Sequence, residues 1–134
     1  QHFADMFGWE NMAATVAKAY HKLSPGEKEK CGIFGGNYGE AGAIDFFGRK
    51  YDLPKAISGH NNYWLWGPRG YTGEVMLMIG VGENHLRSMF REVKQVEIIK
   101  HEYVMPYENN LPVYLCRDAF LPIEEVWPRL KNFN

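Results

Sequence analysis

Apolar residues recur at helical spacing in the first part of the chain. They fall three or four residues apart on one face, at Trp9, Met12, Ala13, Val16, Ala17 and Tyr20. This spacing predicts an amphipathic helix, which Ser24-Pro25-Gly26 stops. Three more helices are predicted at 40–47, ending at Gly48, at 83–93, with Leu86, Met89, Phe90 and Val93 on one stripe, and at 122–130, opened by Pro122.

Short apolar runs between these helices predict strands. The clearest is 74–80, a near-continuous run typical of a strand buried on both faces. Other strands are predicted at 31–34, 55–58, 95–102 and 112–117. Strands that alternate with helices indicate a mostly parallel sheet. The predicted fold is therefore an α/β three-layer sandwich, with a Rossmann-like sheet covered by helices on both faces.

Length and charge narrow the class of protein. The 134 residues match the usual size of one domain, so 1–134 is predicted to be a single soluble α/β domain. The net charge of -1 indicates no general attraction to nucleic acid or to an anionic membrane. No apolar stretch approaches the ~18 residues of a membrane span. The chain begins at Gln1 without an initiator Met, so we expect it to be a piece of a larger protein; removal of an N-terminal methionine is the alternative.

The two cysteines, Cys31 and Cys116, both lie in predicted strands. A free cysteine in such a context packs as a small hydrophobe, so both are expected to be buried and reduced. A disulfide between them is the alternative, and it requires an oxidising compartment. Neither cysteine belongs to a cluster with metal-ligand spacing, and no metal or other cofactor is expected.

Polar clusters follow four of the predicted strands, at 37–40, 58–62, 80–84 and 107–110. If these strands are parallel, all four clusters meet at the carboxyl edge of the sheet, where open α/β sheets bind ligands. Aromatic rings can stack on a sugar, while amide, imidazole and carboxylate groups bond its hydroxyls. The candidate ligand-binding residues are Glu40, His60, Asn61, Asn62, Tyr63, Trp64, Trp66, Tyr107 and Asn109.

Each cluster also has a purely structural interpretation. The asparagines and glycines could only shape turns. His60 could be a satisfied structural histidine, and Glu40 could complement a helix dipole. Tyr63, Trp64 and Trp66 could belong to a core or a domain contact. The sequence leaves these alternatives open.

The usual catalytic motifs are missing. The Gly-rich turn at 35–39 is neither a dinucleotide fingerprint nor a P-loop. Ser58-Gly59-His60 lacks the nucleophile elbow, and nothing fixes the separation of Glu40 and Glu108 as a carboxylate pair. For phosphate, only local cations such as Lys55 or Arg69 could contribute. We therefore assign no catalytic residue.

Two segments resemble a known family. Asn37-Tyr38-Gly39-Glu40-Ala41-Gly42-Ala43-Ile44 and 58–67, Ser-Gly-His-Asn-Asn-Tyr-Trp-Leu-Trp-Gly, look like the carboxyl-terminal soluble region of bacterial membrane glycosyltransferases. These enzymes are related to dolichyl-phosphate-mannose protein mannosyltransferases. Val113-Tyr114-Leu115-Cys116-Arg117 and Trp127-Pro128 are also similar, so the resemblance spans most of the chain.

The resemblance implies a polytopic parent protein that transfers a sugar from a polyprenyl-phosphate donor on the extracytoplasmic, periplasmic face of a bacterial membrane. The family's catalytic acidic residues lie in a loop between early membrane helices, which these 134 residues do not include. The chain would then be an accessory domain without the catalytic centre. Its expected partners are the transmembrane portion of the same protein and a glycan or polyprenyl-phosphate sugar. The alternative is a free-standing α/β enzyme or small-ligand-binding domain with its site at the carboxyl edge.

Overall fold

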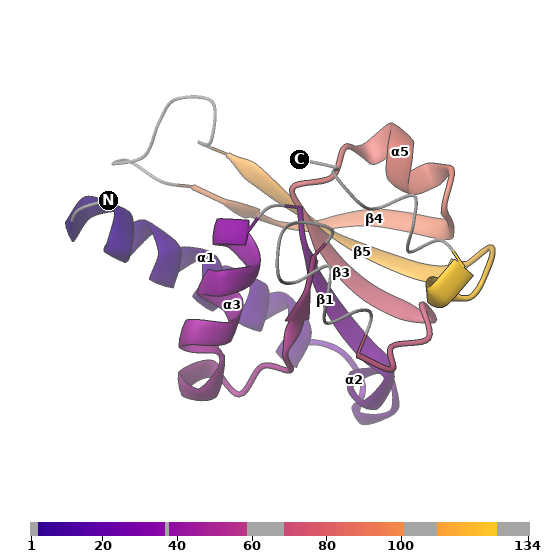
Figure 1. The fold of residues 1–134 in the computed structure, drawn as a ribbon, viewed down its shortest axis with the longest axis horizontal. Helices are drawn as coiled ribbons and strands as arrows, with labels where there is room; N and C mark the ends of the chain where they lie inside the picture. Colours follow the sequence, from indigo (N-terminus) through magenta and orange to yellow (C-terminus); the bar gives the residue numbers. More distant parts are fainter. Residues whose placement is uncertain (1–2, 37, 59–68, 101–109, 126–134) are drawn as a thin grey trace.

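The computed structural model describes residues 3–36, 38–58, 69–100 and 110–125, and Figure 1 shows their arrangement. The elements follow one another as α1 (Phe3–His21), α2 (Pro25–Lys30), β1 (Cys31–Gly35), α3 (Tyr38–Tyr51), β2 (Ala56–Ile57), β3 (Val75–Ile79), α5 (Glu83–Arg87), β4 (Phe90–Ile99) and β5 (Leu111–Ala119). Among the described helices, none is both long and apolar enough to cross a membrane.

The strands form one mixed sheet in the order β2-β1-β3-β5-β4. Strand β1 pairs in parallel with β2 and β3, whereas β5 pairs antiparallel with both β3 and β4. The longest ladder is the antiparallel one between β4 and β5. The predicted mostly parallel, Rossmann-like three-layer sandwich is therefore wrong. The prediction was wrong because the last two strands were expected to extend a parallel sheet, whereas β5 runs antiparallel to both β3 and β4.

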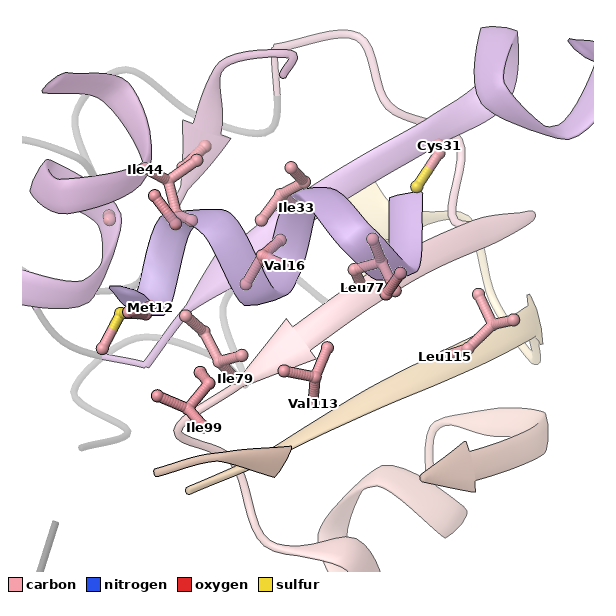
Figure 2. Close-up of a cluster of buried hydrophobic side chains, with 14 of the residues drawn as sticks. Met12, Val16, Cys31, Ile33, Ile44, Leu77, Ile79, Ile99, Val113 and Leu115 are labelled. Atoms are coloured by element: carbon pink, nitrogen blue, oxygen red, sulfur yellow. The ribbon is translucent and has the colours of Figure 1, made fainter. Parts of the chain in front are cut away.

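Both long helices lie on the same face of the sheet. Figure 2 shows Met12 and Val16 of α1 and Ile44 of α3 in one cluster with side chains from the strands beneath. The strand residues in this cluster include Ile33, Leu77, Ile79, Ile99, Val113 and Leu115. Most of the apolar stripe predicted for the first helix is thus buried on the sheet.

The opposite face carries a second core. Strand β3 alternates between the two faces, so that Leu77 belongs to the first cluster and Met78 to the second. The second cluster also contains Leu86 of α5, Phe90 of β4 and Ile123. In the described part of the chain, this face is covered by much shorter helical segments than the face under α1 and α3.

The predicted first helix and the strands at 31–34, 55–58, 74–80 and 112–117 are confirmed, with small shifts in their ends. Two helix ends differ from prediction. Ser24 does not only follow a helix: its side chain accepts a hydrogen bond from the Glu27 N–H and caps α2, with Pro25 in the first turn. Helix α3 continues past Gly48 to Tyr51 and ends where Asp52 adopts a left-handed φ of 58°.

The predicted helix at 83–93 is wrong beyond Arg87. Helix α5 stops there, and Phe90 already begins β4, which contains most of the strand predicted at 95–102. Of the helix predicted at 122–130, the structure describes a helical turn at 123–125, and the rest lies outside the described residues.

Candidate ligand-binding edge of the sheet

Four strands of the sheet point the same way. Strands β1, β2 and β3 are parallel neighbours, and β4 runs with them because both β3 and β4 are antiparallel to β5. Their last residues, Gly35, Ile57, Ile79 and Ile99, therefore lie along one edge, together with Leu111 at the start of β5. We call this the carboxyl edge. The four strands share a direction, as the predicted site requires, although the sheet is not the parallel one that was predicted.

Glu40 lies at this edge in the first turn of α3. Its side chain is buried, at 6% exposed, and Oε1 accepts a hydrogen bond of 2.8 Å from the Gly36 N–H. The same N–H is 2.9 Å from the Ile79 carbonyl oxygen, so it is shared between the carboxylate and β3. Glu40 thus ties the β1–α3 turn to its own helix. This contact favours the structural interpretation of Glu40, as a residue that positions the edge.

Two glycine turns cross closely beside this carboxylate. A Cβ on Gly36 would lie 2.4 Å from the Gly80 carbonyl oxygen, and one on Gly80 would lie 2.2 Å from Glu40 Oε1. Gly80 also has a φ of +79°, which residues with a Cβ rarely adopt. The glycines after β1 and β3 therefore allow two backbone segments and a buried carboxylate to share one small space.

Ser58 follows β2 at the same edge and is fully buried. Ser58 and Glu40 are the buried polar residues of the described chain, and neither lacks an interaction partner. From the third predicted cluster, Val81 is buried, while Glu83 accepts hydrogen bonds from Arg87 one helical turn later. Residues of the 80–84 cluster therefore stabilise α5 as well as forming part of the carboxyl edge.

The other candidate residues cannot be placed in the same way. His60, Asn61, Asn62, Tyr63, Trp64, Trp66, Tyr107 and Asn109 all lie outside the described residues. What the structure does place are the chain positions that flank them. Ser58 follows the carboxyl end of β2, and Lys100 and Asn110 flank the adjoining ends of β4 and β5.

Cys31 and Cys116 are buried and free, as predicted. They belong to the two different hydrophobic clusters, one on each face of the sheet, so the sheet itself separates them. Burial raises the pKa of each thiol to about 12, which keeps both protonated and unreactive at neutral pH. Within the described ranges, no three His, Cys, Asp or Glu side chains are grouped so that they could hold a metal ion.

Sequence reasoning missed two features of the structure. One is the crossing of Gly36 and Gly80, which depends on β1 and β3 being neighbours although they are far apart in the sequence. The other is a hollow beside α3 that brings Arg49 close to the Lys55 segment. Lys55 was noted as a local cation, but the sequence gave no sign that helix residues would join it.

Comparisons of the chain with protein-family models, with curated proteins and with solved structures found no match.

Proposed function

We propose that this chain is the extracytoplasmic accessory domain of a membrane glycosyltransferase that uses a polyprenyl-phosphate-linked sugar. In this proposal the domain helps to recognise the acceptor or a glycan, and the transmembrane portion of the protein carries out the transfer. The proposal rests on the resemblance of residues 37–44 and 58–67 to such enzymes.

One structural observation supports a shared role for these two segments. The first begins directly after β1 and the second directly after β2, and these strands are parallel neighbours. Both segments therefore start at the carboxyl edge, where an α/β sheet offers its loops to a ligand. Glu40, Gly36 and Gly80 hold that edge in a fixed shape through a buried hydrogen bond and close backbone packing.

The chemistry of the second segment suits a glycan. Sugar hydroxyls need donors and acceptors such as Asn61, Asn62 and His60, and the apolar face of a pyranose stacks on rings such as Trp64. We expect no sugar transfer by this domain alone. Departure of the phosphate needs cations or a metal and the acceptor needs a base, and we assign neither a metal nor a catalytic base to this chain.

The second candidate is a free-standing α/β enzyme or small-ligand-binding domain with its site at the same edge. It is favoured by the burial of Glu40, since a buried carboxylate near a ligand edge is a common feature of active sites. Its hydrogen bond to Gly36 gives that carboxylate a structural role, which is why we prefer the accessory domain.

Two measurements separate these candidates. The complete coding sequence should contain several hydrophobic spans before residue 1 if the domain is an accessory, and none if it is free-standing. The isolated chain, incubated with lipid-linked sugar donors and candidate acceptors, should show no turnover. Sustained turnover that is abolished by His60→Ala or Glu40→Gln, in a protein that remains folded, would make this chain the catalytic unit.

Glycan binding is tested directly by titrating acceptor oligosaccharides into the labelled domain and following its amide signals. We expect shifts at Gly36 and Ser58. We also expect a loss of affinity of about fivefold or more in Trp64→Ala, by analogy with a nucleobase stacked on an aromatic ring, which contributes on the order of 1–3 kcal/mol. His21→Ala is the matched control for His60→Ala, because His21 is an exposed histidine that bonds to the Tyr51 carbonyl oxygen. Equal losses in the two histidine variants would count against a site at the carboxyl edge.

A further inference from the structure

A hollow of about 490 Å³ lies between the second half of α3 and the segment that leads into β2. We call it the α3 hollow. Its walls include Ile44, Phe46, Arg49, Leu53, Pro54 and Lys55. None of these residues belongs to the carboxyl edge, so the inference below does not rest on the proposed function.

Two cationic side chains of the α3 hollow are not engaged in ion pairs with other described residues. Arg49 and Lys55 are exposed, and neither forms an ion pair or side-chain hydrogen bond within the described ranges. The adjacent Lys50, in contrast, is paired with Glu10. Arg49 in the last turn of α3 also complements the helix dipole, but Lys55 lies beyond the helix and has no such role.

Among the described residues that line the α3 hollow, the one carboxylate is already engaged. Asp45 Oδ1 accepts a hydrogen bond of 2.8 Å from the Ala56 N–H, and Oδ2 lies 3.9 Å from Arg69 Nη2. Its side chain is only 15% exposed. Asp45 therefore does not neutralise Arg49 and Lys55, and the hollow keeps an excess of positive charge.

Beside these charges the α3 hollow offers apolar surface. Phe46 is 73% exposed, which is unusual for so large an apolar side chain. Its ring packs edge-on against the Phe47 ring, with 4.9 Å between the ring centroids. Leu53 and Pro54 are partly buried, and Ile44 is fully buried. A ligand in the hollow could therefore bury carbon on Phe46 while its charge meets the cations.

We propose that the α3 hollow binds a phosphate monoester attached to an apolar body. The phosphate is held by Arg49, whose guanidinium matches it with paired N–H donors, and by the point charge of Lys55. The apolar body lies against Phe46 and the Leu53-Pro54 wall. Either charge or apolar contact alone would bind weakly in so open a site, because exposed ion pairs contribute little.

The test uses octyl phosphate at monomeric concentrations, with inorganic phosphate and octyl glucoside as the charge-only and apolar-only probes. Binding to the labelled chain is followed through the amide signals of Gly48 and Arg49. We expect octyl phosphate to bind saturably and at least about tenfold more tightly than either partial probe. The double variant Arg49→Gln/Lys55→Gln should lower the affinity for octyl phosphate about tenfold. Phe46→Ala should lower the affinity for octyl phosphate without changing the affinity for inorganic phosphate.

The matched control is Lys94→Gln, since Lys94 is an exposed, uncommitted lysine on β4, and it should leave octyl phosphate binding unchanged. Vesicles that contain phosphatidic acid identify the source of the phosphate. Binding to them that depends on Arg49 and Lys55 assigns the site to a lipid head group, and binding of the soluble probe alone assigns it to a free organic phosphate. Equal affinity for octyl glucoside, absence of saturable binding, or an unchanged double variant would each overturn the proposal.

Discussion

The sheet consists of two parts that are built differently. Strands β2, β1 and β3 run parallel, and α3 packs against β1 and β2; we call these elements the parallel half. Helix α1 packs across both parts of the sheet, against side chains of β1, β3, β4 and β5. Strands β5 and β4 pair antiparallel beside α5, and these form the antiparallel half. Every residue of β1 and β3 is buried, whereas β4 buries only Phe90, Val93 and Ile99 of its ten residues.

This difference shows which interactions stabilise each half of the sheet. The parallel half uses short strands with apolar side chains on both faces, and glycines where the chain turns closely past its neighbour. The antiparallel half uses long strands that pair with each other over many residues and leave much of β4 exposed. We therefore expect the parallel half to tolerate changes in volume poorly, and the antiparallel half to depend more on polar contacts.

The largest expected effect is at the glycine crossing in the parallel half. Gly36→Ala places a Cβ 2.4 Å from the Gly80 carbonyl oxygen, so backbone must move, and we expect a loss of about 3 kcal/mol in the free energy of unfolding. The control is Gly42→Ala in α3, where a Cβ meets nothing within 4 Å and should stabilise by up to about 1 kcal/mol. Urea denaturation measures both. A Gly36→Ala variant as stable as the wild type would mean that the crossing is loose.

A smaller effect distinguishes the two cysteines. Cys116 in β5 has no hydrogen-bond partner for its thiol among the described residues, so Cys116→Ser buries an unpaired hydroxyl and should cost about 2 kcal/mol. Cys31 in β1 donates to the Gly32 carbonyl oxygen at 3.4 Å, so Cys31→Ser keeps a partner and should cost about 1 kcal/mol. Thermal unfolding of the two variants gives the order. The reverse order would contradict the assigned partners.

Arg117 of β5 links the antiparallel half to α2, the short helix before β1, through ion pairs of moderate strength. Its Nε and Nη2 donate to Glu27 of α2 at 2.8 and 3.2 Å, and its Nη1 donates to Glu92 of β4 at 2.8 Å. Arg117→Gln should cost about 1 kcal/mol, since the side chains of Arg117 and Glu27 are 28% and 31% exposed. Arg87→Gln breaks a more exposed pair within α5 and a long hydrogen bond of 3.3 Å to the Val93 carbonyl oxygen, and should cost about 0.5 kcal/mol. Equal losses would show that the pairs of Arg117 contribute no more than an exposed pair.

The smallest effect is a dependence on pH. The hydrogen bond from Arg117 lowers the pKa of the Glu27 carboxyl from 4.5. A lowered pKa gives stability that is fully present above the unfolded pKa and is lost as the pH falls through the folded value. The stability difference between wild type and Glu27→Gln should thus be constant near neutral pH and shrink below about pH 4.5. Glu29→Gln in the same helix is the control, and a difference that grows on acidification would contradict the pairing.

The same contrast explains which elements the sequence could predict. In the parallel half, each strand is a short apolar run bounded by Gly or Pro, and these signals are local. In the antiparallel half, Leu86, Met89, Phe90 and Val93 are all buried as expected, but the last two belong to β4. Their three-residue spacing imitates a helix, although both residues lie in the regular part of the ladder, Phe90 opposite Ala119 and Val93 opposite Cys116. Pairing with β5, which no local pattern shows, decides the outcome.

The candidate site was predictable to a similar extent. Polar and glycine residues after strand ends correctly pointed to Glu40 and Ser58 at one edge, because strand direction follows from simple topology. Their burial was not predictable, since it depends on β3 bringing Gly80 against the β1–α3 turn. Arg49 of the α3 hollow was missed because a basic residue in a last helical turn already has an ordinary explanation.

The outermost strands of the described sheet, β2 and β4, bear on how the protein avoids self-association. An unpaired strand edge can recruit another chain and seed aggregation. The edge at β2 has only two residues, and Asp45 accepts the hydrogen bond of its Ala56 N–H. The longer edge at β4 displays Arg91, Glu92 and Lys94 to solvent and is interrupted by its register shift. Charge and irregularity at β4, together with the shortness of β2, should thus keep the folded chain from extending its sheet into a neighbour.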